Sequence, residues 1–165
     1  MQDLLLIRFQ QLDLPFLGYV HSYLPIEELN EANTYTILRF LEFRNPGLRV
    51  VVPKADFESG ELTNYLYEER TALVKNKYGI LEPESGTIIP SQKMDLVLVP
   101  LLAFDRRGYR VGYGKGLYDR FLQGCRPDAL KIGLSFFEAV DHIDDTADFD
   151  IPLTHCVTPE KVYEF

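Results

Sequence analysis

The residues with the clearest chemical potential lie at positions 104–119, which read Phe-Asp-Arg-Arg-Gly-Tyr-Arg-Val-Gly-Tyr-Gly-Lys-Gly-Leu-Tyr-Asp. Four glycines fall within nine of these residues. Glycines let successive backbone N–H groups point the same way, and a helix that begins after them adds a dipole favourable to an anion. Lys115 can place a charge on a terminal phosphate, and Asp119, one helical turn later, can reach a phosphate-bound magnesium ion. The segment is therefore predicted to bind phosphate groups.

Two common phosphate-binding motifs do not fit this segment. The P-loop requires serine or threonine after its lysine, whereas Gly116 follows Lys115. The dinucleotide-binding fingerprint requires glycine at the position of Leu117. A plain glycine-rich turn is the alternative interpretation, and it explains the glycines but not the combination of Lys115 with Asp119.

The elements that must position this loop follow an α/β pattern. Residues 95–100 form an apolar run that is typical of a strand buried on both faces of a mostly parallel sheet, and ligands gather at the end of such a strand. Further strands are predicted over residues 16–23, 48–52, 62–67, 131–135 and 155–158, and helices over residues 4–12, 30–43 and 116–123.

The connections between these elements complete the predicted fold. Pro53 is expected to close the strand before it, and residues 78–86 are expected to form a loop. The order is interpreted as β-α-β throughout. This order predicts a single-domain, Rossmann-like three-layer α/β sandwich, with a mostly parallel central sheet and helices on both faces.

Composition narrows the classes of function. The 165 residues are enough to form one hydrophobic core. The two cysteines, Cys125 and Cys156, do not have the spacing of a metal-binding motif. A net charge of −8 argues against broad binding to nucleic acid or anionic membranes. No apolar run approaches the roughly 20 residues that span a bilayer, and residues 1–10 carry no export signal. A cytoplasmic protein with no nucleic-acid or membrane partner is expected.

Several segments together closely resemble the 5-formyltetrahydrofolate cyclo-ligase family, whose members are also called 5,10-methenyltetrahydrofolate synthetases. The matching segments are residues 95–100, 103–105 and 108–122, with residues 78–83 upstream and residues 131–134 and 150–153 downstream. The resemblance implies a reaction that uses ATP and Mg2+ to close 5-formyltetrahydrofolate into 5,10-methenyltetrahydrofolate. ADP and phosphate are released after phosphorylation of the formyl oxygen. The resemblance further implies a monomer with one domain over residues 1–165, which starts after the helix that usually opens the family.

The resemblance also assigns roles to individual residues. It places ATP in a loop formed by Arg110, Val111, Gly112, Tyr113, Gly114, Lys115, Gly116, Leu117 and Tyr118. Within this loop, Lys115 and Tyr118 are the catalytic candidates. The folate substrate is assigned to Ile26 and Glu31, together with Tyr113, Gly114, Lys115, Gly116 and Leu117. Mg2+ is assigned to Asp119 and Asp150.

Each acidic assignment has a physical basis and a structural alternative. Glu31 suits a pterin ring because its two oxygens can accept hydrogen bonds from neighbouring N–H groups. Glu31 and Asp119 can instead be acids that stabilise the start of a helix, and Asp150 lies in an acidic stretch typical of a solvated surface. The core is the favoured location for four tyrosines that are also candidates for the pterin pocket, Tyr19, Tyr23, Tyr65 and Tyr78.

The sequence departs from the family pattern at three positions in these segments. Arginine is common where Tyr113 stands, tyrosine is frequent where Leu117 stands, and histidine precedes the acidic residue where Phe149 stands. Two hypotheses therefore stay open, an active cyclo-ligase and a non-catalytic domain that retains a folate or nucleotide pocket. A sugar-phosphate isomerase or transferase is a more distant third, which residues 108–119 disfavour.

Overall fold

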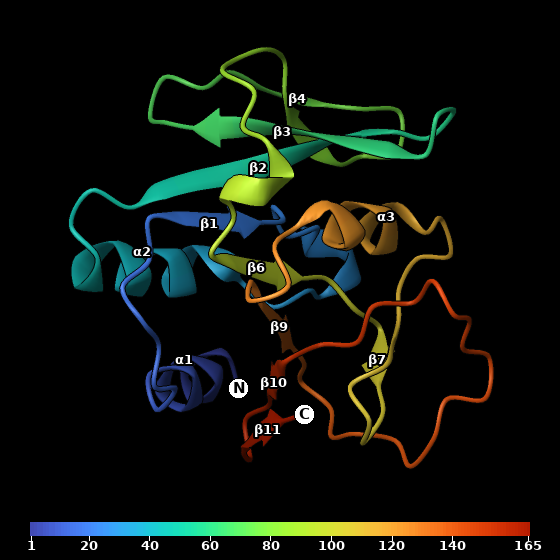
Figure 1. The fold of residues 1–165 in the computed structure, drawn as a ribbon. Coiled ribbons are helices and arrows are strands. Elements are labelled where there is room, and N and C mark those ends of the chain that lie inside the picture. The colour runs from blue at the N-terminus through green and yellow to red at the C-terminus, as the bar shows by residue number, and fades with distance from the viewer.

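A computed structural model describes residues 1–165 (Figure 1). A seven-stranded mixed sheet forms its centre, in the order β11-β10-β9-β6-β1-β2-β3. The five inner strands are parallel and comprise β10 (His155–Val157), β9 (Leu130–Leu134), β6 (Leu96–Val99), β1 (Tyr19–Ser22) and β2 (Arg49–Asp56). An antiparallel strand closes each edge, β3 (Glu61–Tyr67) beside β2 and β11 (Val162–Glu164) beside β10. The predicted α/β class with a mostly parallel sheet is confirmed.

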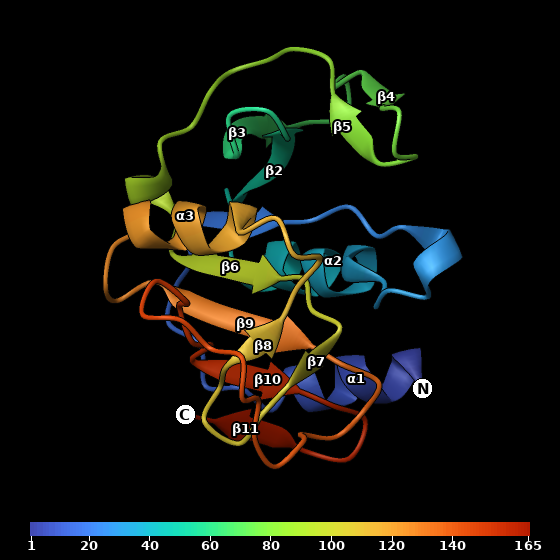
Figure 2. The same ribbon diagram turned by 90° about the vertical axis from the view of Figure 1, so that its right-hand side faces the viewer.

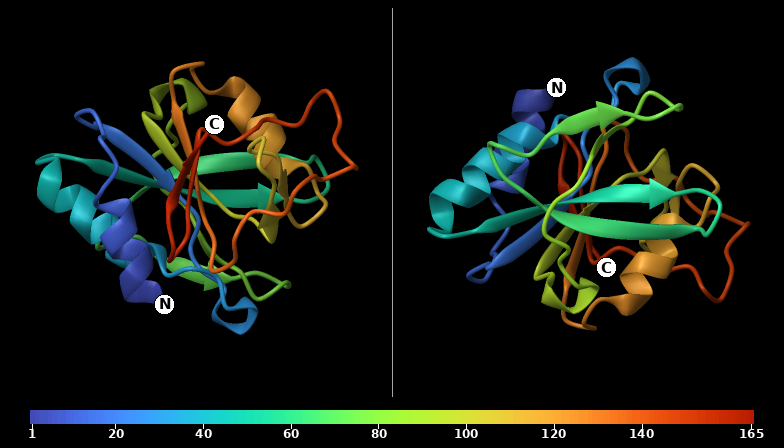
Figure 3. Two further views of the ribbon diagram at one scale, coloured as in Figure 1. Left: turned by 90° about the horizontal axis from the view of Figure 1, so that it is seen from below. Right: turned by 90° about the horizontal axis from the view of Figure 1, so that it is seen from above.

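Helices pack on both faces of this sheet (Figure 3). The three α-helices are α1 (Gln2–Phe9), α2 (Thr34–Arg44) and α3 (Leu117–Gly124). Side chains alternate across a strand, so that Leu96 and Leu98 of β6 pack in the core beneath α1 and α2, whereas Val97 packs with Phe121 of α3. All four residues of β6 are buried, as its apolar run predicts. None of the helices is long and apolar enough to cross a membrane.

Helix α2 begins later than predicted. The side chain of Asn33 accepts a hydrogen bond from the backbone N–H of Tyr35 over 2.9 Å and caps the helix. Before it, a short 3-10 helix, η1 (Glu27–Leu29), ends at Asn30, whose φ of 51° lies in the left-handed region. Residues 30–33 therefore cannot continue a helical turn, and the predicted start at residue 30 is wrong.

One prediction about a strand end and one about a loop are also wrong. Strand β2 continues through Pro53 to Asp56 instead of stopping at the proline. Proline is tolerated there because β1 pairs with β2 only as far as Val51, so no ladder hydrogen bond on that side needs the missing N–H. Residues 78–86 are not simply a loop, since they contain β5 (Leu81–Pro83), which pairs antiparallel with β4 (Leu73–Lys75).

The β-α-β order does not hold at the edges of the sheet. Strands β2 and β3 are consecutive and antiparallel, as are β10 and β11. The β2–β3 hairpin extends the sheet beyond β1, and the β4–β5 hairpin lies beside it (Figures 1 and 2). On the opposite side, β7 (Ala103–Phe104) and β8 (Arg110–Val111) form a small ribbon that leads into the glycine-rich loop. A second 3-10 helix, η2 (Ser91–Lys93), precedes β6.

Candidate active site

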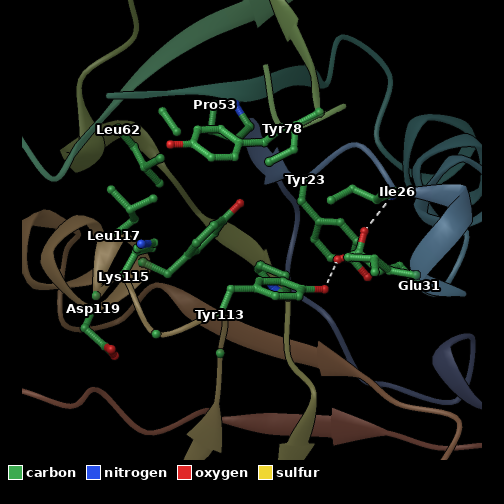
Figure 4. Close-up of a pocket in the computed structure, with 18 of the residues that line it drawn as sticks. Tyr23, Ile26, Glu31, Pro53, Leu62, Tyr78, Tyr113, Lys115, Leu117 and Asp119 are labelled. Carbon is green, nitrogen blue, oxygen red and sulfur yellow. Dashed lines mark hydrogen bonds between the residues drawn. The ribbon is translucent and has the colours of Figure 1, made fainter. Parts of the chain in front are cut away.

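A cavity of about 870 Å³ opens where the parallel strands end. Tyr23, just after β1, and Pro100, just after β6, both line it. Loop crevices at the carboxyl ends of parallel strands are the usual ligand sites of open α/β sheets. Figure 4 shows Glu31 and Asp119 at opposite ends of this cavity, with Tyr113 and Lys115 between them. The two carboxylates therefore lie at separate ends of one cavity.

Every residue predicted for the site lines this one cavity. The set comprises Ile26, Glu31, Arg110, Val111, Gly112, Tyr113, Gly114, Lys115, Gly116, Leu117, Tyr118, Asp119 and Asp150. These residues come from three separate segments, the loop after β1, the stretch from β8 into α3, and the segment before β10. The fold thus brings the predicted substrate, nucleotide and metal residues together, while their individual roles stay predictions.

The glycine-rich loop presents an open backbone surface. Gly114 and Gly116 have φ angles of 82° and 67°, which side-chain-bearing residues rarely adopt. A methyl group added at Gly112, Gly114 or Gly116 would meet no heavy atom within 4 Å. Gly116 is also the N-cap residue of α3, so the loop ends at the positive end of a helix. This arrangement fits the phosphate groups of a nucleotide.

Lys115 supplies an uncommitted positive charge in this loop. Its side chain is exposed, lines the cavity and makes no hydrogen bond or ion pair within the protein. Arg110 lies deeper, and its Nε atom is buried without a hydrogen-bond partner. A buried donor without a partner is uncommon and indicates a group that is satisfied by a ligand or water. Both cations are therefore placed to meet an anion.

Asp119 and Asp150 each retain one carboxylate oxygen without a partner in the protein. Asp119 accepts hydrogen bonds through Oδ1 from Arg110, over 3.3 Å, and from the backbone N–H of Ile151, over 3.1 Å. Asp150 accepts through Oδ2 from the N–H of Ala147 over 2.8 Å. No group of three His, Cys, Asp or Glu residues could hold a metal ion alone. Two carboxylates fit Mg2+ that also binds phosphate oxygens and water, because Mg2+ commonly takes only one or two protein carboxylates.

Glu31 is held at the other end of the cavity by two hydrogen bonds (Figure 4). The backbone N–H of Ile26 donates to Glu31 Oε2 over 2.6 Å, and the hydroxyl of Tyr113 donates to Glu31 Oε1. Partial burial and the hydrogen bond to Glu31 raise the pKa of Tyr113 above its ordinary value, so its hydroxyl remains a proton donor at neutral pH. Glu31 does not cap α2, because that role belongs to Asn33.

Two further tyrosines form the floor of the cavity. The hydroxyl of Tyr118 is buried without a hydrogen-bond partner, and that of Tyr23 donates to the backbone oxygen of Ala32 over 3.4 Å. Burial, reinforced by the Glu31 carboxylate, raises the pKa of both phenols. The Tyr118 hydroxyl is therefore a neutral group that can donate a hydrogen bond to a bound molecule.

Sequence reasoning missed most of the apolar wall of the cavity, of which only Tyr78 was a candidate. Pro53, Phe57 and Leu62 of the β2–β3 hairpin line it, together with Tyr78 from the turn before β5. Tyr78 is 53% exposed rather than part of the core, and its ring packs against Phe57 with centroids 4.6 Å apart. Phe57 and Tyr78 are aromatic residues next to turns, and this position could have indicated a role in a binding surface. Tyr19 and Tyr65 do not line this cavity.

Comparisons of the sequence with known proteins identify the family of the chain. Residues 17–159 match the model of the 5-formyltetrahydrofolate cyclo-ligase family. The chain is 34% identical over 123 residues to the 5-formyltetrahydrofolate cyclo-ligase of Escherichia coli (strain K12), which covers 72% of this chain and 68% of the relative. It is 30% identical over 127 residues to the enzyme of that name from Haemophilus influenzae, which covers 74% and 67% of the two chains.

Solved structures show the same fold. The NMR structure of Aquifex aeolicus 5,10-methenyltetrahydrofolate synthetase superposes with a TM-score of 0.77 at 27% identity, and the match covers 99% of this chain and 80% of that one. The fold is also shared with a 5,10-methenyltetrahydrofolate synthetase from Mycoplasma pneumoniae, with a TM-score of 0.70 at 22% identity over 95% and 84% of the chains. The protein is therefore an enzyme of the 5-formyltetrahydrofolate cyclo-ligase family.

Proposed function

We propose that the protein uses ATP to convert 5-formyltetrahydrofolate to 5,10-methenyltetrahydrofolate, with release of ADP and phosphate. One observation carries this proposal: the glycine loop with Lys115 opens onto the same cavity as Glu31. A surface suited to phosphate and a carboxylate suited to a nitrogen heterocycle thus face the same cavity. A reaction between ATP and a pterin requires that proximity.

The substrate would occupy the end of the cavity that contains Glu31. The N–H groups of the pterin ring would donate to the Glu31 carboxylate, while Tyr78 and Phe57 would cover its apolar face. The nucleotide would lie along residues 112–116, where backbone N–H groups and Lys115 meet its phosphates. Asp119 and Asp150 would hold Mg2+, which supplies charge neutralisation at the phosphates.

The proposed chemistry has two steps. The formyl oxygen attacks the terminal phosphorus of ATP, and the bond to the ADP oxygen breaks. The formyl carbon, now attached to a phosphate leaving group, is attacked by the neighbouring folate amine. The carbon–oxygen bond then breaks, phosphate departs and the amine loses its proton. Lys115 and the glycine N–H groups would stabilise the charge that develops on the transferred group, and the Tyr118 hydroxyl would donate a hydrogen bond within the site.

Product formation tests this function directly. Methenyltetrahydrofolate absorbs light where 5-formyltetrahydrofolate does not, so the purified chain can be assayed by absorbance with and without ATP and Mg2+. Product that requires ATP is the expected result. Binding of both ligands without product would instead support the non-catalytic alternative, a domain that retains its pockets.

The Glu31→Gln variant tests which end of the cavity receives the folate. Glutamine still has an oxygen that can accept from Ile26, but it lacks the charge and the second acceptor. We expect its dissociation constant for 5-formyltetrahydrofolate to rise by about tenfold. The dissociation constant for a non-hydrolysable ATP analogue should stay the same, and equal losses for both ligands would contradict the assignment.

A further inference from the structure

Both oxygens of Glu31 accept hydrogen bonds from within the protein. Oε2 accepts from the backbone of Ile26, and Oε1 accepts from the hydroxyl of Tyr113, which belongs to the glycine-rich loop. The Tyr113 contact is the only hydrogen bond that joins residues 112–116 to the Glu31 end of the cavity. Tyr113 occupies one of the two lone pairs of Oε1, so a ligand that donates to Oε1 from the same side competes with Tyr113.

We propose that Tyr113 is a positioning residue that tethers the glycine loop to Glu31 in the free protein and yields Oε1 when the folate binds. This inference rests on the proposed function, because it takes the folate as the ligand of Glu31. In this proposal the Tyr113 hydroxyl both restrains the glycine loop and occupies Oε1 of Glu31. Substrate binding at one end then changes the freedom of the loop at the other.

The surroundings of Tyr113 permit such an exchange. The residue is 44% exposed and is not part of the buried core. Gly112 and Gly114 flank it and have open space beside their Cα atoms, which lets the backbone rotate without a clash. The hydroxyl is protonated at neutral pH, so it binds Glu31 as a donor and competes with a pterin N–H that approaches the same lone pair of Oε1.

The Tyr113→Phe variant separates a tether from a substrate contact. Removing the hydroxyl frees Oε1 before the folate arrives, so the dissociation constant for 5-formyltetrahydrofolate, measured without nucleotide, should fall by about tenfold. A hydroxyl that contacts the bound folate would give the opposite sign. An unchanged or raised dissociation constant overturns the proposal.

Backbone dynamics give a readout that needs no ligand. The heteronuclear 15N NOE reports picosecond to nanosecond motion, and we expect it to fall at residues 112–116 of the free Tyr113→Phe protein. Tyr109→Phe is a matched control. Tyr109 lies four residues before Tyr113, and its hydroxyl makes no hydrogen bond. Adding 5-formyltetrahydrofolate to the unmodified protein should lower the NOE at the same amides.

The two readouts distinguish failure of this inference from failure of the proposed function. If the unmodified protein does not bind 5-formyltetrahydrofolate, the proposed function is wrong. The folate then cannot displace the Tyr113 hydroxyl from Glu31, and that part of the inference is wrong too. The NOE values of the free proteins still decide whether Tyr113 tethers the loop. If the folate binds but these NOE values are the same in all three proteins, the tether is wrong and the proposed function stands.

Discussion

The guanidinium of Arg110 donates to the carboxylate of Asp119 over 3.3 Å and thereby joins the two ends of the glycine-rich loop. Arg110 belongs to β8 and Asp119 to the first turn of α3, so residues 112–116 bridge two anchored points. The two side chains are only 5% and 13% exposed. Removing one member of a buried ion pair leaves the other charge unpaired, which is strongly destabilising. The pair is thus a structural support for the loop.

Asp119→Ala should lower the free energy of unfolding by about 3 kcal/mol, because it leaves the Arg110 guanidinium and the N–H of Ile151 without their acceptor. Urea denaturation measures this change. The control is Asp141→Ala, which breaks an exposed pair with Arg106 and should leave stability unchanged. Equal stability of Asp119→Ala and the unmodified protein would show that the pair does not support the fold.

Lys115→Ala should lower kcat/KM for product formation by about 100-fold, since it removes the only uncommitted cation of the glycine loop. The urea midpoint should not move, because an exposed lysine without partners contributes little to stability. Lys93→Ala removes an exposed lysine outside the cavity and serves as the control for charge alone. Loss of folded structure in Lys115→Ala would argue against its assignment to the site.

The site residues that lie close together in sequence were the easiest to predict. Residues 110–119 form one continuous segment, and the spacing of its glycines predicted an open backbone surface, which the structure places at the cavity. Strand β6 was equally clear, because a strand buried on both faces needs an uninterrupted apolar run. A sequence pattern is enough to predict an element when neighbouring residues alone determine its structure.

Features that depend on pairing between distant segments were beyond sequence reasoning. Whether Pro53 ends a strand depends on where β1 stops pairing with β2, and the proline itself does not reveal this. The hydrogen bond between Tyr113 and Glu31 joins residues 82 positions apart. Strand β5 is only three residues long and forms through β4, so its own composition resembles a loop. Each of these depends on tertiary contacts rather than local preference.

His21 should make stability depend on pH. The imidazole is buried with Nε2 2.8 Å from Asn64 Oδ1, and burial lowers its pKa from 6.5 to about 4 despite that hydrogen bond. Between these values the unfolded chain binds a proton that the folded protein does not. The free energy of unfolding therefore falls as the pH drops from 6.5 towards 4, by a total of about 3 kcal/mol from this group.

Urea denaturation from pH 7 to pH 4.5 gives the free energy of unfolding of the unmodified protein and of His21→Gln. The difference between the two free energies isolates the contribution of His21 from that of the carboxylates. The gap between the two should narrow as the pH falls. His142→Gln, which removes an exposed imidazole, should run parallel to the unmodified protein at every pH. A constant gap for His21→Gln would mean that the buried imidazole is not the cause.

Gly114→Ala and Gly47→Ala form a pair that separates backbone strain from ligand binding. The φ angles are 82° and 84°, and an added methyl group meets no heavy atom within 4 Å at either position. Each variant should therefore lose about 1 kcal/mol of stability, the approximate cost of placing a side chain in the left-handed region. Only Gly114 lines the cavity, so only Gly114→Ala should weaken binding of a non-hydrolysable ATP analogue, because its methyl group occupies space where a phosphate would approach the backbone. Calorimetric titration measures the affinity for the analogue, and urea denaturation measures the stability. If both variants lose the same stability and bind the analogue with the same affinity, the nucleotide does not lie against Gly114. The open face of the loop would then not be the surface that binds the nucleotide.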